Sequence, residues 1–357
     1  MIDSDNMVDL TRRMRDSVRF PRAFANSDGV FSDWRNHTLE FVLQAVGLSN
    51  NTAQAGPEII QTETGEGYAK NQLILHFSSG ETAAACLLTP DGAGPFPAIL
   101  LLHDHGSNFG IGHDKMIRPG AGAATAEAAQ LWVDRLYGGR FLGGLLAQRG
   151  YVVLCVDALG WGSRAGNGYE AQQALAANMM QFGTSLAAVV AGEDAEAARF
   201  LAGLPQVDKT RVASFGFSFG GFRAWQVAAL CDQITASFCG GWMATLQGLM
   251  QPGSNQLRGQ SAFYMLHPPL AGKLDYPDLA GLAAPKPTLF FSGTEDRHFP
   301  TASVKSAFDI LKNIWTTAGH AENLATRFWP AAHVFPADQQ DAAFDWLDRT
   351  FQTDHKT

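Results

Sequence analysis

The spacing of hydrophobic residues changes several times along the chain and predicts which segments form strands. Early in the chain, three short runs are typical of strands with one face in a core: 58–62, 71–77 and 82–88. Two later runs are more continuously apolar: 97–102, and one that begins at 211 and is typical of a strand buried on both faces. Further strands are predicted at 151–156, 236–242, 287–292 and 325–329.

Helical spacing of apolar residues recurs between these strands and beyond them, over 33–47, 141–149, 194–202, 222–230 and 341–351. Antiparallel strands followed by strand–helix alternation predict an α/β fold with a mostly parallel central sheet flanked by helices. In such sheets, functional groups gather at the carboxyl ends of the strands. We divide the chain into an N-terminal helical extension, 1–56, which packs against the rest, and one large domain, 57–357.

The composition narrows the classes of partner and of site. Hydrophobic residues make up 46% of the 357 residues and charged residues 17%, as in a globular protein with a large core. The net charge is −8, so nucleic acid and anionic membrane surfaces are not expected as partners. The four cysteines lack metal-binding spacing and predict buried, reduced thiols. The acidic N-terminus and the absence of a long apolar run predict a cytoplasmic protein with no membrane segment.

One motif contains a candidate catalytic nucleophile. A buried strand beginning at Arg211 leads into Gly216-Phe-Ser218-Phe-Gly220, and a helical pattern follows at 222–230. In a strand–turn–helix context, G-x-S-x-G places a serine on strained backbone with its hydroxyl exposed above the sheet. The helix N-terminus then lies beneath the negative charge that forms during attack. The alternative is a glycine-rich turn with an incidental serine; the flanking strand and helix favour Ser218 as a nucleophile.

A serine nucleophile needs a base and a carboxylate that orients the base. In α/β-hydrolases these follow the serine in the order acid, then histidine. Asp296 lies after the predicted strand 287–292 and is the expected acid, with Glu295 as the alternative. His333 lies between the strand 325–329 and the last helix and is the expected base. His298 and His320 are weaker candidates for this role.

Two backbone N–H groups should bind the developing oxyanion. We assign one to Phe219, directly after the nucleophile, and the other to His105 in the turn after strand 97–102. The pairs of histidines and acids at 103–105 and 113–114 also suggest a metal site, but further ligands at suitable spacing are missing. We therefore expect no metal.

Three segments are longer than simple connections require and lie on the loop side of the predicted strands: 107–136, 160–192 and 243–275. We expect them to form lid-like insertions and apolar pocket walls with few polar groups. Trp161, Trp242 and Tyr264 are the expected substrate-contacting residues, although any one such residue can equally be part of the core. Arg140 and Arg164 either meet a substrate carboxylate or pair with surface acids.

Together these residues resemble the α/β-hydrolase superfamily, and within it the branch near dienelactone hydrolases and acetyl xylan esterase-like proteins. The resemblance covers roughly residues 57–351 and rests on the segments 103–106, 157–164, 216–221, 276–288, 293–300 and 332–335. It implies a catalytic triad of Ser218, Asp296 and His333, and oxyanion-hole amides from Phe219 and His105. Asp104 departs from the glycine that is common at its position in relatives.

The resemblance implies cofactor-free hydrolysis of a carboxylic ester through an acyl-enzyme, with a small-molecule substrate such as an acetyl or other small acyl ester, carbohydrate esters included. A peptidase or amidase, and a lactonase or C–C hydrolase, would use the same triad and stay open. The alternative outside enzymes is a catalytically silent homologue that binds a ligand. The sequence leaves the oligomeric state open, a homodimer included.

Overall fold

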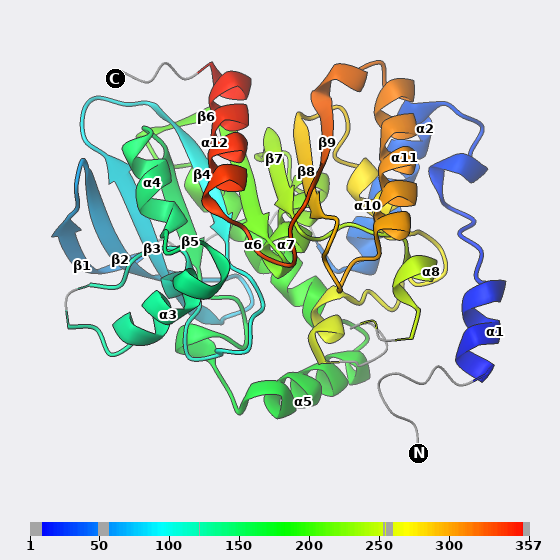
Figure 1. Cartoon of the computed structure of the whole chain (residues 1–357), viewed down its shortest axis with the longest axis horizontal. Coiled ribbons are helices and arrows are strands. Elements are labelled where there is room, and N and C mark those ends of the chain that lie inside the picture. The colour runs from blue at the N-terminus through cyan, green and yellow to red at the C-terminus, as the bar shows by residue number, and fades with distance from the viewer. Residues whose placement is uncertain (1–8, 49–56, 121, 253, 255–259, 353–357) are drawn as a thin grey trace.

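The computed structural model describes residues 9–48, 57–120, 122–252, 254 and 260–352, and within these the strands form one sheet (Figure 1). Its order is β1-β2-β3-β5-β4-β6-β7-β8-β9. The strands β1, β2, β3 and β5 pair antiparallel, and β5, β4 and β6 to β9 pair parallel. Their bounds are β1 Glu58–Thr64, β2 Tyr68–His76, β3 Thr82–Pro90, β4 Phe96–Leu102, β5 Val152–Val156, β6 Val207–Phe217, β7 Ala236–Gly240, β8 Thr288–Gly293 and β9 Leu324–Trp329.

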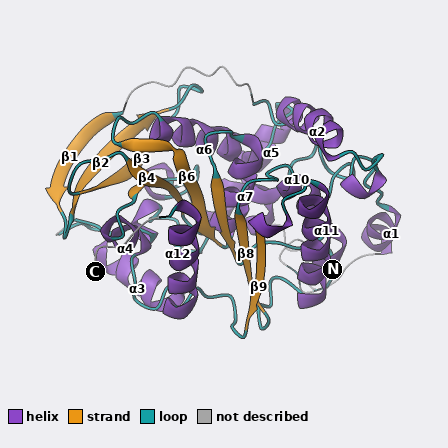
Figure 2. Ribbon diagram, turned by 90° about the horizontal axis from the view of Figure 1, so that it is seen from above, coloured by secondary structure: helices purple, strands orange, loops and turns teal. Residues whose placement is uncertain are grey.

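Helices cover both faces of this sheet (Figure 2). One layer contains α3 Ala126–Leu136, α4 Leu142–Gln148 and α12 Ala337–Phe351. The other contains α6 Leu186–Ala202, α7 Phe219–Leu230, α10 Tyr276–Gly281 and α11 Thr301–Thr317, joined by α2 Phe31–Ala45. The remaining helices are α1 Asp9–Ser17, α5 Gly168–Gln181 and the short α8 Leu246–Leu249. The predicted fold class, a mostly parallel α/β sheet flanked by helices, is confirmed.

The pleat of the central strands divides their side chains between two cores. In β4, Ala98, Leu100 and Leu102 face the layer of α6 and α7, whereas Ile99 and Leu101 face the layer of α3, α4 and α12. All five side chains are fully buried or nearly so. A strand buried on both faces needs apolar residues at every position, which explains the continuous apolar runs in the sequence.

Several predicted boundaries differ from those in the structure, and two of these differences have a local cause. The helix predicted from Asp194 begins at Leu186, because Ser185 caps it by accepting a hydrogen bond from the amide of Ala188 at 3.1 Å. The strand predicted to reach residue 242 ends at Gly240, because Gly241 adopts a left-handed backbone with φ 62°.

The described part of the N-terminal segment, residues 9–48, packs against the layer of α10 and α11. Trp34 and Val42 of α2 are buried in the same core as those helices. The amide of Phe24 donates to the carboxylate of Asp278 at 2.9 Å, and Arg35 donates to the carbonyl of Leu282 at 2.9 Å. The segment thus shares the core of the large domain. Residues 1–8 and 49–56 of the predicted extension lie outside the described residues.

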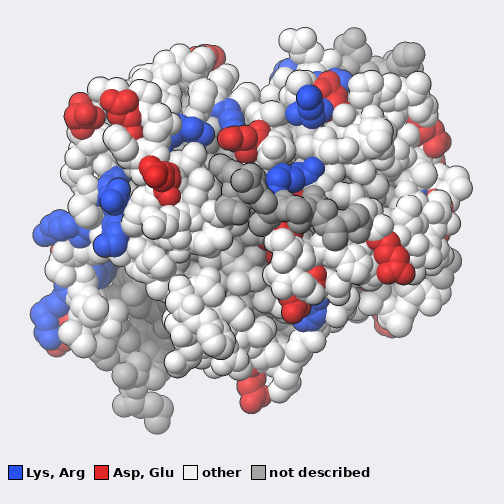
Figure 3. All heavy atoms as spheres, turned by 180° about the vertical axis from the view of Figure 1, so that it is seen from behind, with Lys and Arg blue, Asp and Glu red and all other residues white. Residues whose placement is uncertain are grey.

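The face opposite to that of Figure 1 carries both signs of charge: basic side chains gather toward one edge, and acidic side chains are scattered over the rest (Figure 3). In α1, Arg12 pairs with Asp9 and Arg15 with Asp16, which balances part of the positive charge locally. Within the described residues, no single helix is long and apolar enough to cross a membrane; α5 and α6 meet that test only as a pair, and the pair is bent by 91°.

A buried ion pair joins α6 to α7 behind the sheet. Arg223 donates to both carboxylate oxygens of Asp194, at 2.9 and 2.6 Å, and both side chains are at most 4% exposed. Burial, the largest influence, raises the pKa of Asp194, and the guanidinium opposes that rise. The pair therefore ties together two helices that would otherwise each bury an unbalanced charge.

Arg223→Met should lower the free energy of unfolding by about 3 kcal/mol, because it leaves the Asp194 carboxylate buried without its partner. Urea denaturation followed by tryptophan fluorescence measures the change. Arg211→Met is the control, since the Arg211–Asp208 pair is about a quarter to a third exposed and should contribute less than about 1 kcal/mol. Equal losses in the two variants would contradict the structural role assigned to the buried pair.

Candidate active site

The turn between β6 and α7 holds Ser218 in strained backbone, with φ 57° and ψ −125°. Its amide donates to the carbonyl of Gly240 at 2.8 Å, which ties the turn to the end of β7. A Cβ on Gly220 would collide with the carbonyl of Leu102, and one on Gly221 would collide with that of Gly240. These contacts require glycine, and they hold the serine hydroxyl at the carboxyl edge of the sheet.

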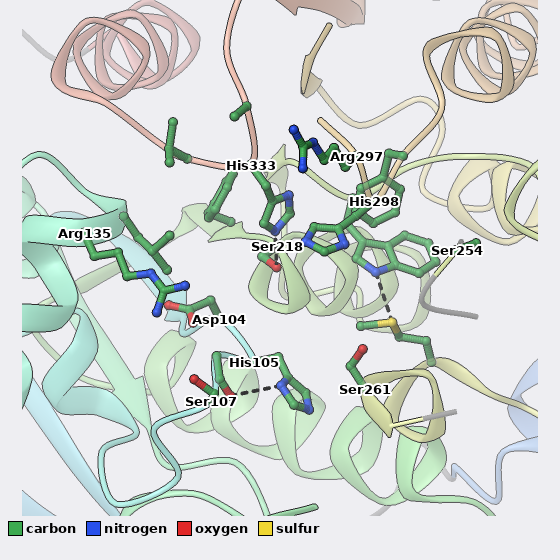
Figure 4. A pocket seen from close by; sticks show the side chains of 18 of the residues that line it. Asp104, His105, Ser107, Arg135, Ser218, Ser254, Ser261, Arg297, His298 and His333 are labelled. Carbon is green, nitrogen blue, oxygen red and sulfur yellow. Dashed lines mark hydrogen bonds between the residues drawn. The ribbon is translucent and has the colours of Figure 1, made fainter. Parts of the chain in front are cut away.

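Ser218, His333 and Asp296 form a continuous hydrogen-bonded chain, and Figure 4 shows Ser218 and His333 side by side at the cavity. His333 Nε2 lies 2.8 Å from Ser218 Oγ, and His333 Nδ1 lies 2.6 Å from Asp296 Oδ2. The second carboxylate oxygen of Asp296 accepts from the backbone amide of His298 at 2.8 Å. Asp296 comes from the turn after β8 and His333 from the loop between β9 and α12, so the parallel strands bring together residues far apart in sequence.

The ring of His333 is held in one orientation by its neighbours. The rings of Phe217 and Phe299 lie 4.9 and 6.0 Å from it, centroid to centroid, and that of His298 meets it edge-on at 4.8 Å. Because Nδ1 faces the carboxylate, a neutral imidazole carries its proton there and leaves Nε2 free to accept from the serine hydroxyl. Of the candidates named from the sequence, the structure joins Asp296 and His333 to Ser218 by hydrogen bonds, and not Glu295, His298 or His320.

The hydroxyl of Ser218 opens into a cavity of about 760 Å³. All three predicted insertions contribute to its wall: Trp132 and Arg135 from the first, Tyr169 from the second, Met265 from the third. The wall is more polar than the sequence suggested. Its polar side chains outside the triad include Asp104, Ser107, Arg135, Ser261, Glu295 and Arg297, and its aromatic ones are Trp132, Tyr169, Phe217, Trp242 and Phe299.

Of the three residues expected to contact substrate, Trp242 lines this cavity and the other two do not. Trp161 and Tyr264 are fully buried and pack against each other at 4.7 Å and against the ring of His105 at 4.9 and 5.9 Å. The expectation that their side chains form the pocket surface is therefore corrected. Sequence alone does not separate a pocket aromatic from one directly behind the wall, because both occur in the same apolar insertion.

The loop after β4 places His105 at the cavity with its ring turned away from the triad. Burial, with a smaller effect from Lys115, lowers the pKa of the imidazole to about 4, so the ring is neutral. Its Nε2 lies 3.1 Å from Gln172 Oε1. Within the described residues, neither the backbone N–H of His105 nor that of Phe219 donates to a backbone carbonyl outside the regular bonding of helices and strands. Both amides are thus available as the hydrogen-bond donors that the sequence suggested.

The histidine–acid pairs that suggested a metal have other partners. His113 Nδ1 lies 2.7 Å from Asp157, which also accepts from the amides of His113 and Ser163, both at 2.8 Å. Among the described residues, no group of three or more His, Cys, Asp or Glu side chains is arranged to hold a metal ion. The pair instead fastens the loop after β4 to the loop after β5.

The sequence interpretation missed two arginines at the cavity, Arg135 and Arg297. The two arginines it considered bind acids elsewhere: Arg140 pairs with Asp341 and Arg164 with Glu193. Arg297 directly follows Asp296, the predicted acid, so its position near the site could have been predicted from the sequence. Arg135 lies on a helix of the first insertion, and its position depends on how that insertion folds back.

Residues 142–353 match the dienelactone hydrolase family. The chain belongs to that family. The enzyme prediction is confirmed at this level: the protein is a hydrolase of the esterase type with the α/β-hydrolase fold.

Individual relatives agree with this assignment. A protein of Bacillus subtilis (strain 168) named "Putative hydrolase YtaP" is 26% identical over 266 residues, which is 74% of this chain and 82% of that protein. A "putative acetyl xylan esterase" from Bacteroides fragilis NCTC 9343 superposes with a TM-score of 0.71 at 16% identity, over 92% of this chain and 84% of its own. A glucuronoyl esterase from Solibacter usitatus has a TM-score of 0.62 at 15% identity, over 89% and 92% of the two chains. The two structural likenesses show the common fold.

His113→Gln should destabilise this hydrolase most at acid pH. Although burial opposes it, Asp157 raises the pKa of His113 above its usual 6.5, so the stabilisation is fully present below 6.5 and is lost as pH rises through the raised pKa. We expect a loss of about 3 kcal/mol in unfolding free energy at about pH 5.5 and a smaller loss at about pH 9.5. Urea denaturation of both proteins at the two pH values measures this. A difference that does not depend on pH would exclude a charged pair.

Proposed function

We propose that the protein hydrolyses carboxylic esters by two-step acyl transfer, with Ser218 as nucleophile, His333 as general acid and base, and Asp296 as the residue that orients and stabilises the imidazolium. The observation that carries the proposal is the position of His333, with Nε2 2.8 Å from the serine hydroxyl and Nδ1 2.6 Å from a carboxylate that is almost fully buried.

In the first step, Ser218 Oγ attacks the ester carbonyl carbon while His333 Nε2 accepts the hydroxyl proton. The tetrahedral oxyanion binds the amides of Phe219 and His105, and its collapse expels the alcohol, which takes the proton from His333. In the second step, His333 accepts a proton from water as that water attacks the acyl-enzyme. Collapse of the second tetrahedral intermediate releases the acid and returns the proton to Ser218. Only groups of the protein and water take part.

For the substrate, we propose a small acyl ester of a carbohydrate, such as an acetylated sugar. The cavity combines hydroxyl and charged side chains with the aromatic rings of Trp132, Tyr169 and Trp242, and this combination suits a polyhydroxylated alcohol that stacks on aromatic faces. The names of two proteins of the same fold, an acetyl xylan esterase and a glucuronoyl esterase, agree with such a class.

Ser218→Ala should abolish turnover of 4-nitrophenyl acetate, and Asp296→Asn should lower kcat by about 10⁴-fold, because the asparagine amide favours the wrong tautomer of His333. A fluorophosphonate probe should label the wild-type protein at Ser218. His320→Gln is the matched control, since His320 pairs with Glu322 at the surface and does not line the cavity. Full activity in a folded Ser218→Ala variant would refute the mechanism, and a wild-type protein without labelling or turnover would favour a silent ligand-binding homologue.

Matched ester and anilide substrates separate an esterase from an amidase. We expect 4-nitrophenyl acetate to be cleaved with a kcat/KM at least about 100-fold above that of 4-nitroacetanilide, because an amine is the poorer leaving group and nothing in the proposed relay compensates for it. Acetate release from acetylated xylo-oligosaccharides tests the carbohydrate class. Preference for the anilide, or for octanoyl over acetyl esters, would contradict the proposed substrate class.

A further inference from the structure

A lysine without any solvent exposure lies behind the loop that supplies the second oxyanion amide. Lys115 Nζ donates to the backbone carbonyl of His105 at 2.8 Å and to that of Asp104 at 3.2 Å. It does not line the cavity, whereas Asp104, His105 and Gly106 do. The loop therefore lies between the ammonium group and the substrate space.

Both carbonyls receive a second donor. His103 Nε2 accepts from the amide of Ala158 at 3.1 Å, so its Nδ1 carries the proton and donates to the carbonyl of Asp104 at 2.8 Å. Trp161 Nε1 donates to the carbonyl of His105 at 2.6 Å. A carbonyl oxygen has two lone pairs, so Lys115, His103 and Trp161 fill the acceptor capacity of two consecutive peptide groups.

This arrangement decides where the N–H groups point. In a trans peptide, the C=O and the following N–H point in opposite directions. Because one ammonium group binds the carbonyls of Asp104 and His105, the amides of His105 and Gly106 both point to the other side, toward the cavity. Successive N–H groups on one side form an anion-binding concavity, and the φ of 50° at Gly106 is consistent with such a turn.

The charge of Lys115 strengthens the effect. A cation at the carbonyl end of a peptide group polarises its N–H end positively, toward the site of the oxyanion. Asp104 Oδ1 lies 3.8 Å from Nζ, while Oδ2 accepts from Tyr137 at 2.6 Å and from Trp132 at 3.1 Å. Burial lowers the pKa of Lys115 to about 8, with Asp104 opposing that change, so the group is still mostly protonated at neutral pH.

We propose that Lys115 is a positioning residue for the oxyanion hole: it fixes two consecutive peptide groups so that the amides of His105 and Gly106 converge on the oxyanion. Trp161 contributes a second hydrogen bond that holds the carbonyl of His105. The proposal rests on the serine-esterase mechanism above and extends it to residues that do not touch the substrate. It also gives Trp161 a role other than substrate contact.

The test compares Lys115→Met with a matched variant, Lys286→Met. Lys286 is also largely buried, has a pKa lowered by burial to about 8, and donates to two backbone carbonyls, those of Ala228 and Cys231, at 2.7 and 3.0 Å. It does not lie at the cavity. Both variants should lose stability. Lys115→Met alone should lose kcat for 4-nitrophenyl acetate by about 100-fold with little change in KM, as expected when oxyanion stabilisation is lost.

Binding of a transition-state analogue separates positioning from general loosening of the site. For Lys115→Met, the affinity for an alkyl boronic acid, which forms a tetrahedral adduct on Ser218, should fall by about the same factor as kcat/KM, and the affinity for acetamide, a neutral ground-state analogue, should change little. Trp161→Phe, which removes only the assisting donor, should show the same pattern at about 10-fold and serves if Lys115→Met does not fold. The double variant Lys115→Met/Asp104→Asn also removes the charge of the Asp104 carboxylate, which Lys115→Met leaves without its cation. The loss of kcat should remain in this double variant.

If the wild-type protein turns over ester, the esterase mechanism stands and three results would overturn the proposal. They are an unchanged kcat in folded Lys115→Met, equal losses of kcat in Lys115→Met and Lys286→Met, and recovery of kcat in the double variant. Failure of the mechanism itself is seen separately, in the wild-type protein, as absence of both turnover and fluorophosphonate labelling. The expected pattern, with kcat and boronate affinity reduced together in Lys115→Met only, supports both.

Discussion

The close approach of backbone at the turn after β6 is the constraint on which the other features depend. Ser218 adopts a conformation that L-amino acids avoid, which costs about 1–3 kcal/mol. The cost is met because α7 packs so closely on β4 and β7 that Gly220 contacts the carbonyl of Leu102 and Gly221 that of Gly240. The same packing sets the position of the hydroxyl relative to every strand end, and the helix N-terminus directly behind it favours negative charge there. The serine cannot relax its backbone without separating a helix from the sheet.

Around this turn, the protein uses buried polar groups to orient peptide planes and rings. His333 is aligned by Asp296, Asp296 by the amide of His298, and the loop after β4 by donors placed behind it. These groups are costly to bury unless each finds a partner, and most of them do. Fully partnered networks of this kind are rigid, as the proposed oxyanion site requires, since its donors must be in place before charge develops.

The insertions form the wall of the cavity, which the edge of the sheet alone does not provide. The strand ends bring the reacting groups together, but the cavity wall comes from α3, the segment around Tyr169 and the segment that ends at Met265. In the proposed mechanism, this division separates the reacting groups at the strand ends from the residues that surround the substrate. The polar and aromatic character of the wall here is a property of how those segments pack on one another, with Trp161 and Tyr264 forming the layer beneath the surface.

Features that have a local cause, such as strands and the strained turn, could be predicted from the sequence. Continuous apolar runs predicted strands buried on both faces, and the spacing of glycines around Ser218 predicted the strained turn, because close backbone approach excludes a Cβ. The chain order of serine, acid and histidine at successive strand ends predicted the three residues that the structure joins by hydrogen bonds. Tertiary structure alone decided which aromatic residues face the cavity, that Arg135 and Arg297 reach it, and that Lys115 lies behind the loop after β4. Those positions depend on contacts between insertions far apart in the chain, and no local pattern of side chains records which face of a folded-back segment meets solvent and which meets the core.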